Sequence, residues 1–393
     1  MLSIQLRRGL PIPAPSLIYW YPLPFGMKSS LVTFAPGRVE LLGNHTDYNA
    51  GVVLSGAIQY GVTARIVPGT PGLVELSSSD FKEGFAGGLA ELAAIDKGSW
   101  MRYPAGVILA LAALGSDISA LGAQLNFESD LPSGAGLSSS AALEVATALA
   151  VLAAAGRADT LGTLEIAKLC KQVENDFVGV SCGLLDQVSS AFGKAGHAIY
   201  LDCRTEAVEN VPAPAGVALL VAHSGVAHRL TGGEYNERRA QCFAAAAKLG
   251  VPFLRDVDSA TLEAEAGKLT ELELSRARHI VGENERVFEG IGHLRAGNAA
   301  AFGKLMFASH QSSRVNFANS TPELDELVDI AAGLDGVYGS RLTGGGFGGA
   351  TVSLVDAARQ EAIGQALADQ YAERTGNRSV VYPCVLGDGA HVK

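Results

Sequence analysis

The amino-acid sequence predicts a two-domain protein of mixed α+β structure. The chain has 393 residues, which is long for one hydrophobic core. Alternating, β-branched segments are interspersed with segments of helical periodicity, and the sequence has no internal repeat. The proline-containing stretch 211–216 is the best domain boundary, because a new strand pattern follows it directly. We therefore expect an atypical N-terminal extension over 1–27, a first domain over 28–210 and a second over 211–393.

Strands and helices alternate in the predicted first domain. Residues 31–34, 52–66 and 73–76 have the β-branched, alternating composition of strands. Residues 106–115 and 139–156 are predicted to be helices, and each is closed by a glycine.

A further helix is predicted over residues 164–178. Its apolar stripe includes Ile166, Cys170 and Phe177, and Glu174 lies beside that stripe. A carboxylate next to a buried face requires a partner. Taken alone, Glu174 is more simply interpreted as a partly exposed helix residue.

The predicted second domain begins with a strand over 217–222. Helices follow over 236–249 and 272–294, and a β-rich part is expected around 336–354. The order of elements is therefore again mixed, which is typical of an α+β domain.

Composition favours a folded, acidic protein. Hydrophobic residues make up 48% of the chain and charged residues 18%, so a sizeable core is available. The net charge of −10, without a basic tract, argues against nonspecific nucleic-acid binding. Apolar runs are too short to span a bilayer, and prolines interrupt residues 1–27, which excludes a signal-peptide core there. The five scattered cysteines have no CxxC spacing. We expect reduced thiols in a cytoplasmic monomer with no membrane or nucleic-acid partner.

The segment 131–144, LPSGAGLSSSAALE, has the composition of a phosphate-binding loop. Gly134 and Gly136 permit positive φ and close approach, and the helix that follows offers unpaired N–H groups and the positive end of its dipole. No Lys-Ser/Thr pair follows the glycines, so the segment is not a Walker loop. By itself it fits a glycine turn before a buried helix equally well.

Other segments decide between these two interpretations. The sequence APGRVELLGNHTDY at 35–48 resembles the sugar signature of galactokinases. The serine-rich loop resembles the nucleotide loop of GHMP small-molecule kinases, and SRLTGGGFGGA at 340–350 resembles their third, glycine-rich motif. Together with GLLDQ at 183–187, these likenesses extend over nearly all of 33–385 in the family's order. The chain is thus identified as a member of the GHMP kinases, most similar to galactokinases, with an active site in the cleft between two α+β domains.

The resemblance implies that the protein phosphorylates the anomeric C1 hydroxyl of galactose with ATP and Mg²⁺. Asp186 would be the base that accepts the sugar's proton, and Arg38 would hold Asp186 ionised and stabilise the transferring phosphoryl group. Ser140 and Glu174 would ligate Mg²⁺, which favours hard oxygen ligands. In isolation, Asp186 and Arg38 would be read as an N-cap and a surface residue.

Glycine density over 343–349 indicates a backbone that runs close to another group, which we expect to be the triphosphate facing the first loop. A tight packing corner is the plainer alternative. The nucleotide-binding residues implied by the resemblance are Pro132, Gly134, Ala135, Gly136, Leu137, Ser138, Ser139, Ser140, Ala141, Gly345 and Gly346.

The sugar-contacting positions implied by the resemblance are Asn44, His45, Asp47, Gly183 and Tyr235. Asn44 stands where the family usually has glutamate. This exchange removes a negative charge and replaces a pure acceptor by an amide that both accepts and donates. If position 44 faces C6, the site would tolerate a 6-carboxylate that glutamate would repel. Galactose remains the leading substrate.

Two alternative functions stay open at this point. One is a 1-kinase for a related sugar such as galacturonate, arabinose or N-acetylgalactosamine. The other is a galactokinase-like sugar sensor, which binds ligand and a regulatory partner without turnover. Such sensors are damaged in the serine-alanine part of the loop, whereas 138–142, Glu174 and Asp186 are intact here.

Overall fold

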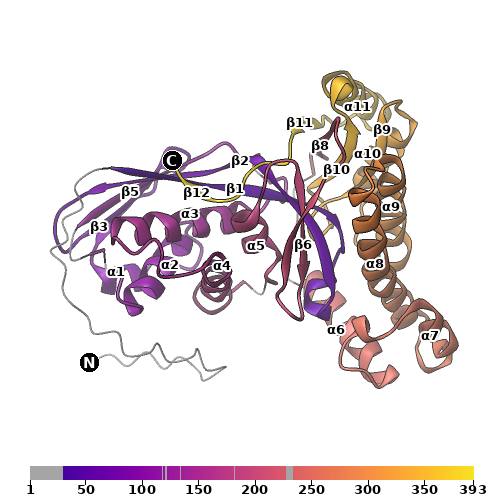
Figure 1. The fold of residues 1–393 in the computed structure, drawn as a ribbon, viewed down its shortest axis with the longest axis horizontal. Helices are drawn as coiled ribbons and strands as arrows, with labels where there is room; N and C mark the ends of the chain where they lie inside the picture. Colours follow the sequence, from indigo (N-terminus) through magenta and orange to yellow (C-terminus); the bar gives the residue numbers. More distant parts are fainter. Residues whose placement is uncertain (1–29, 117, 120–121, 133, 181, 227–232) are drawn as a thin grey trace.

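The computed structural model describes residues 30–116, 118–119, 122–132, 134–180, 182–226 and 233–393. The predicted extension 1–27 lies outside the described residues. Two bodies lie side by side in Figure 1, each built from a sheet covered by helices. The fold is therefore the two-domain α+β arrangement that the sequence predicted.

The first sheet has eight strands in the order β12-β1-β2-β5-β3-β4, with β6 paired to β2 and β7 paired to β6. All pairs are antiparallel except β3 with β5. The strands are β1 (Leu31–Leu42), β2 (Val52–Pro68), β3 (Val74–Ser78), β4 (Phe85–Gly87), β5 (Ala123–Ser129), β6 (His197–Asp202), β7 (Val208–Pro212) and β12 (His391–Val392).

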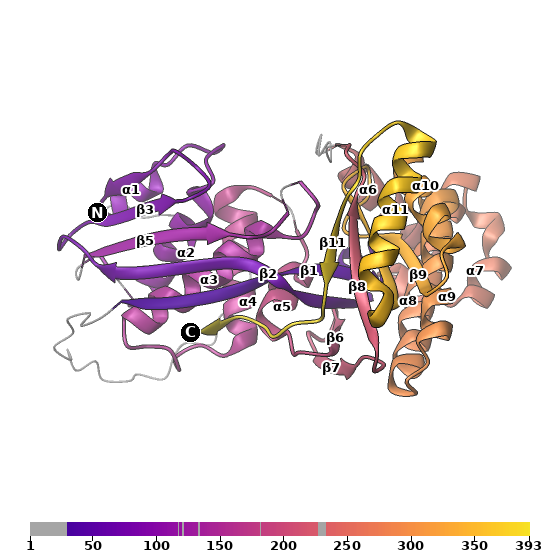
Figure 2. The same ribbon diagram turned by 90° about the horizontal axis from the view of Figure 1, so that it is seen from above.

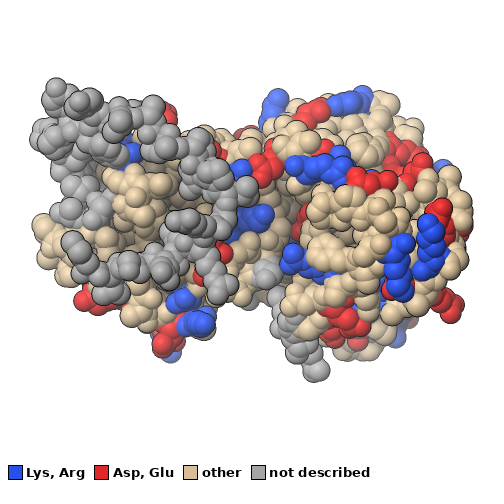
Figure 3. Space-filling view, turned by 90° about the horizontal axis from the view of Figure 1, so that it is seen from below, with Lys and Arg blue, Asp and Glu red and all other residues tan. Residues whose placement is uncertain are grey.

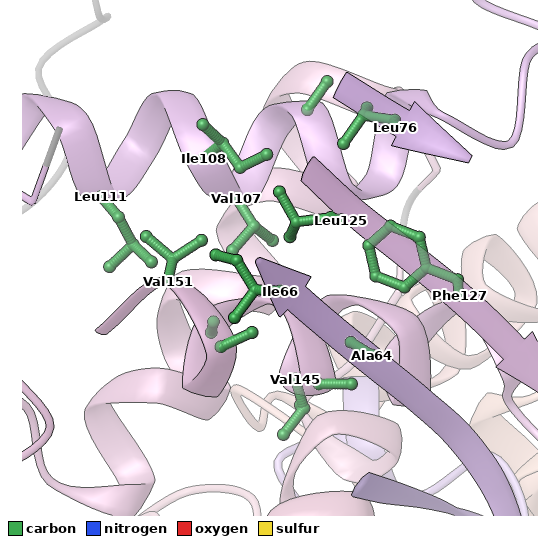
Figure 4. Close-up of a cluster of buried hydrophobic side chains, with 14 of the residues drawn as sticks. Ala64, Ile66, Leu76, Val107, Ile108, Leu111, Leu125, Phe127, Val145 and Val151 are labelled. Atoms are coloured by element: carbon green, nitrogen blue, oxygen red, sulfur yellow. The ribbon is translucent and has the colours of Figure 1, made fainter. Parts of the chain in front are cut away.

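Helices α1 to α5 cover one face of this sheet (Figure 1). Ile66, Leu125 and Phe127 from the strands pack there against Ile108 and Val151 from the helices (Figure 4). Burying these side chains is the main favourable term that holds the layer to the sheet. The helices are α1 (Leu89–Ala93), α2 (Arg102–Ala113), α3 (Ser139–Ala154), α4 (Thr163–Gln172) and α5 (Leu185–Phe192).

Three elements differ from the sequence prediction. The strand predicted over 31–34 continues to Leu42, because register shifts beside Pro36 and after Glu40 let the pairing resume past residues that disfavour strands. The helix predicted from 106 already begins at Arg102, since Pro104 is tolerated in a first turn. The helix predicted over 164–178 is α-helical only to Gln172 and then becomes a π-helix over Val173–Val178.

The second sheet is antiparallel, in the order β11-β8-β10-β9. Its strands are β8 (Val217–His223), β9 (Val337–Leu342), β10 (Ala350–Asp356) and β11 (Val380–Cys384). Helices α8, α9, α10 and α11 gather around this sheet (Figure 2). The helices of this part are α6 (Gly233–Leu249), α7 (Ser259–Ala264), α8 (Glu271–Arg295), α9 (Ala299–Ser312), α10 (Pro322–Gly333) and α11 (Gln360–Thr375).

The chain passes between the two sheets twice. It leaves the first sheet after β7 and enters the second at β8, a change that supports the domain boundary we propose at residue 211. After β11 it returns, and β12 pairs with the start of β1 through Thr33 opposite Val392 and Phe34 opposite His391. The last residues therefore belong to the first sheet, although they follow the second in sequence.

Charged side chains of both signs are interspersed over the face drawn in Figure 3. Ion pairs on the helices of the second domain include Arg278 with Glu263 and Lys248 with Glu273. In the described part of the chain, no helix combines the length and the apolar character needed to cross a membrane.

Candidate active site

Strand β1 and helix α5 bring Arg38 and Asp186 together. Arg38 Nε lies 2.8 Å from Asp186 Oδ1, and Arg38 Nη1 donates to the carbonyl oxygen of Gly136 at 2.6 Å. Arg38 is buried, whereas the Asp186 side chain keeps 27% of its surface exposed. A single guanidinium thus connects the candidate base to the glycine-rich loop, and the carboxylate stays accessible.

The serine-rich loop contacts the same carboxylate from the other side. Ser138 Oγ donates to Asp186 Oδ2 at 2.5 Å, and helix α3 begins at the next residue. Gly134 and Gly136 have φ of 74° and 68°, so the predicted need for positive φ is confirmed. Ser138 also has a positive φ of 60°, which is unusual for a serine and is often found at functional sites.

The third glycine-rich motif runs along the first loop. A Cβ on Gly344 would lie 3.4 Å from the Gly136 carbonyl oxygen, and one on Gly349 would lie 3.9 Å from the Gly134 carbonyl oxygen. A Cβ on Gly346 would lie 2.1 Å from the carbonyl oxygen of Asn319. Close approach of backbone to backbone therefore explains Gly346, whereas Gly344 and Gly349 have positive φ of 74° and 83°, which favours glycine. The two predicted loops do face each other.

Glu174 is buried on the π-helical turn, beside the start of α3. Its carboxylate accepts hydrogen bonds from Gln187 Nε2 at 2.7 Å and from the Ser140 hydroxyl. Burial raises the pKa of Glu174, and the nearby Asp186 raises it further. The structure thus brings Ser140 and Glu174 together, as the resemblance implied.

Two further residues of this cluster were not singled out in the sequence. Gln187 Nε2 also lies 3.4 Å from Glu144 Oε2, so the amide bridges two carboxyl groups. Glu144 is fully buried, and burial together with Glu174 raises its pKa to about 10, which makes it a neutral acid at pH 7. Both residues lie inside the quoted motifs SSSAALE and GLLDQ, which was the available signal.

The chemistry of this cluster fits a hard cation. Its candidate ligand atoms are the oxygens of Ser140 and Glu174, and Glu144 Oε1 and Gln187 Oε1 are buried without a hydrogen-bond partner. The Cys182 thiol also donates to Glu174 Oε2 at 3.4 Å. Among the described residues, no group of three or more His, Cys, Asp or Glu side chains is arranged to hold a metal by itself. A hydroxyl and one carboxylate are nevertheless a suitable protein share for Mg²⁺, which usually keeps waters and phosphate oxygens as its other ligands.

His45 connects the sugar signature to the third motif. Its Nε2 is 2.9 Å from the Gly345 carbonyl oxygen and its Nδ1 is 2.9 Å from the Tyr48 hydroxyl. Burial lowers the pKa of His45 to about 4, so the ring is neutral at pH 7. Because a carbonyl can only accept, the proton resides on Nε2 and Nδ1 accepts from Tyr48. The His45 ring also packs 5.1 Å, between centroids, from the ring of Tyr235.

Asp47 and Gly183 are in close contact. A Cβ on Gly183 would lie 2.0 Å from Asp47 Oδ2, so any larger residue at this position would have to displace the Asp47 carboxylate. Burial raises the pKa of Asp47 to about 6, to which the charge of Asp186 contributes. Burial also raises the pKa of Tyr235, and the neighbouring charges of Asp47 and Asp186 add to that shift. The predicted sugar-contacting residues therefore gather around the candidate base.

Asn44 differs from the others because both ends of its amide are engaged within the protein. Its Nδ2 donates to Glu40 Oε2 at 3.1 Å and to the Gly344 carbonyl oxygen at 2.8 Å. Its Oδ1 accepts from Asn319 Nδ2 at 2.9 Å. Only 1% of the residue is exposed. The sequence had not singled out Glu40, although it lies two positions after Arg38 in one strand.

Comparison with known proteins agrees with this geometry. Residues 102–194 match the GHMP kinases N terminal domain, residues 24–68 the galactokinase galactose-binding signature and residues 291–373 the GHMP kinases C terminal domain. The chain is 42% identical over 370 residues to a galactokinase of Roseiflexus sp. (strain RS-1), covering 93% of both chains. It is 41% identical over 374 residues to a galactokinase of Streptomyces coelicolor, covering 93% of this chain and 95% of that one.

Solved structures show the same relationship. The structure of Lactococcus lactis galactokinase complexed with galactose superimposes with a TM-score of 0.87 at 32% identity, over 93% of this chain and 95% of that one. A mevalonate kinase superimposes with a TM-score of 0.67 at 20% identity, over 92% of this chain, and so shares the fold.

Proposed function

The chain belongs to the galactokinase family of GHMP kinases, and on that basis we propose that it transfers the γ-phosphoryl group of ATP to the C1 hydroxyl of galactose. The observation that carries this proposal is the position of Asp186, which is hydrogen-bonded to Arg38 on one oxygen and to the loop residue Ser138 on the other. A base fixed beside a phosphate-binding loop is what transfer to a hydroxyl requires.

Asp186 acts as the general base. It accepts the proton of the C1 hydroxyl as that oxygen attacks the γ-phosphorus, and ADP leaves. Arg38 and Ser138 hold the two carboxylate oxygens in place, so the remaining lone pairs are oriented without a further loss of side-chain entropy. The Arg38 guanidinium also compensates negative charge beside the transferring group.

The nucleotide is held by the loop over 132–141 and by Gly345 and Gly346 of the third motif. Backbone N–H groups at the start of α3 and the positive φ of Gly134 and Gly136 support anion binding there. Ser140 and Glu174 would hold Mg²⁺, which neutralises the charge of the ATP phosphates when bound. Gln187 orients the Glu174 carboxylate through its 2.7 Å hydrogen bond.

The sugar is bound by Asp47, Tyr235 and the backbone at Gly183. The His45 ring packs against the ring of Tyr235 and holds it in place. Asp47 offers hydrogen-bond acceptors, and Tyr235 offers a hydroxyl and a flat ring. We further propose a cytoplasmic monomer, which the negative net charge and five unpaired cysteines support.

The proposal is tested with the purified full chain, MgATP and a panel of galactose, galacturonate, arabinose and N-acetylgalactosamine. Rates of ADP release measure turnover, and NMR of the product locates the phosphate. We expect galactose to be the best substrate and its product to carry phosphate at C1. Binding of galactose without ADP release would instead support the sugar-sensor alternative. Phosphorylation of none of the sugars would refute the kinase assignment.

A further inference from the structure

Glu40 is a buried carboxylate on the face of β1 that carries Arg38. Arg38 pairs with Ala57 and Glu40 with Ser55, and the register between the two pairs is unbroken. Side chains two positions apart in a regular strand point to the same side. Because Arg38 reaches Asp186 on that side, Glu40 faces the candidate active site as well. Only 3% of Glu40 is exposed, and this burial raises its pKa to about 7, although Arg341 and Arg38 oppose the shift. The carboxylate is therefore fully charged only above neutral pH, and its charge acts in a poorly solvated environment.

Asn44 and Arg341 hold this carboxylate. Asn44 Nδ2 lies 3.1 Å from Glu40 Oε2 and 3.4 Å from Glu40 Oε1. Arg341 Nη1 lies 3.9 Å from Glu40 Oε1. Arg341 is completely buried, and its Nε and Nη2 atoms have no hydrogen-bond partner. The negative charge of Glu40 therefore also compensates a buried cation.

The amide of Asn44 is held by the protein rather than presented to a sugar: the residue is 1% exposed, its nitrogen donates to Glu40 and Gly344, and one of the two lone pairs of its oxygen accepts from Asn319. A carboxylate has about four lone-pair sites, so the contacts to Asn44 leave Glu40 with acceptor capacity. Glu40 also interacts electrostatically with Arg38 and Asp47, and its charge affects Tyr235. Asp47 and Tyr235 line the proposed sugar site, and Arg38 holds the proposed base beside it.

We propose that Glu40 determines the specificity of the sugar site: its carboxylate, held by Asn44, accepts a hydrogen bond from a hydroxyl of a neutral sugar and excludes sugars that carry a carboxylate. This inference rests on the proposed function. It reverses the expectation drawn from Asn44 alone. An asparagine at 44 does not make the site receptive to sugar acids, because the negative charge is supplied four residues earlier in the chain.

The substitution Glu40→Gln separates this role from a purely structural one. It keeps the shape and removes the charge, so that no carboxylate at position 40 repels an anionic sugar and less negative charge opposes the buried Arg341 cation, which also interacts with Glu283. The readout is the ratio of kcat/KM for galacturonate to kcat/KM for galactose. We expect this ratio to rise by on the order of ten- to a hundredfold over wild type, as for other single-contact discriminations. A purely structural role would lower both values together and leave the ratio unchanged.

A matched control is available in Glu283, another buried carboxylate of the same region. It accepts the backbone N–H groups of Gly43 and Asn44 at 2.8 and 2.9 Å, and it forms an ion pair with Arg286. Glu283→Gln therefore also removes a buried charge beside the sugar signature. Unlike Glu40, this carboxylate holds the backbone at Gly43 and Asn44 and is not proposed to contact the sugar. We expect its galacturonate-to-galactose ratio to stay within about threefold of wild type, well below the discrimination of a direct contact.

Two double variants keep the test decisive if Glu40→Gln does not fold. E40N/N44E exchanges the carboxylate and the amide across their hydrogen bond and keeps the combined length of the two side chains, so it should retain the wild-type ratio. E40Q/R341M removes both buried charges, and it should fold because a buried ion pair can often be replaced by uncharged residues of similar volume. The ratio should still rise, because the carboxylate that repels a sugar acid is absent.

An unchanged ratio in folded Glu40→Gln or E40Q/R341M, with galactose still phosphorylated, would overturn this inference and leave the proposed function standing. Failure of the wild type to phosphorylate any sugar would overturn the proposed function instead. The two failures are therefore distinguishable in one experiment.

Discussion

Replacing Asp186 with asparagine removes one negative charge and changes the shape of the side chain very little. The amide oxygen can still accept from Arg38 Nε, which now lies 2.8 Å from Oδ1. The amide nitrogen can donate to Ser138 Oγ, because a hydroxyl both donates and accepts. Arg38 keeps its hydrogen bond to the Gly136 carbonyl oxygen. The variant therefore isolates the loss of proton acceptance and of the ion pair.

The size of the effect follows from these two losses. General base catalysis contributes roughly 10²- to 10⁴-fold to a rate, which corresponds to about 3 to 5 kcal/mol in the activation free energy. Loss of the charged partner costs stability as well. Arg38 is only 7% exposed, so its guanidinium would lose a neighbouring carboxylate that water cannot replace. The Asp186 side chain is 27% exposed, so solvent screens the pair and the stability loss should be about 1 to 2 kcal/mol.

The assay is the initial rate of ADP release at saturating MgATP and galactose, with galactose affinity measured separately by calorimetry. Ser138→Ala is the control, because it removes the hydrogen bond to Oδ2 and leaves the charge of Asp186. We expect Asp186→Asn to lose kcat with little change in galactose affinity, and Ser138→Ala to lose about tenfold or less, as for one neutral hydrogen bond. Near-normal turnover in folded Asp186→Asn would remove Asp186 from the mechanism. Equal losses in both variants would show that orientation, not proton acceptance, is the contribution of Asp186.

Ser140→Ala should raise the Mg²⁺ concentration required for half-maximal rate, and Glu174→Gln should raise it more because it also removes a charge; an unchanged Mg²⁺ dependence in both would show that the ligands are wrongly assigned. Gly183→Ala should raise KM for galactose by about tenfold or more, since its Cβ would lie 2.0 Å from Asp47 Oδ2 and must displace that carboxylate. A wild-type KM in this variant would argue against a sugar contact there. For Asp202, burial alone would raise the pKa, but hydrogen bonds from a guanidinium and two backbone N–H groups bring it down to about 2. Since this pKa is depressed, the stabilisation is complete above about pH 4 and is lost as the pH falls toward 2. Asp202→Asn should therefore lower the free energy of unfolding by about 2 kcal/mol at pH 7 and by much less at pH 2, measured by urea titration at both values; an equal loss at both would contradict the charge-based explanation.

Local sequence patterns were sufficient for elements whose residues interact mainly with their neighbours. The helix predicted over 139–156 is found over Ser139–Ala154, and the strand predicted over 52–66 is found over Val52–Pro68. Helical periodicity and strand alternation are properties of short windows, so they can be read directly from the chain. The β12 strand could not be predicted in this way, because two residues show no alternation and their pairing with β1 is formed across almost the whole chain.

The candidate site divides in the same manner. Asp186, Arg38 and the serine-rich loop were identified from motifs, because each motif keeps its chemistry and its glycines within a few consecutive residues. Glu144 and Gln187 were missed although they lie in those motifs. Their relation to Glu174 arises only when α3, α5 and the π-helical turn pack together. The spacing of residues along the sequence does not predict a hydrogen bond between separate elements of this kind.

By itself, the sequence determined the family, the reaction type and the residue types available at the site. Only the tertiary structure decided what Asn44 does, since its amide is engaged by Gly344 and Asn319, which lie 300 and 275 positions away, and by Glu40 in the strand that precedes it. The physical reason is that a polar group buried from water must satisfy its hydrogen bonds with whichever partners the fold places beside it. Residue identity sets what Asn44 can donate and accept, and the packing of the two sheets selects the groups that receive those bonds.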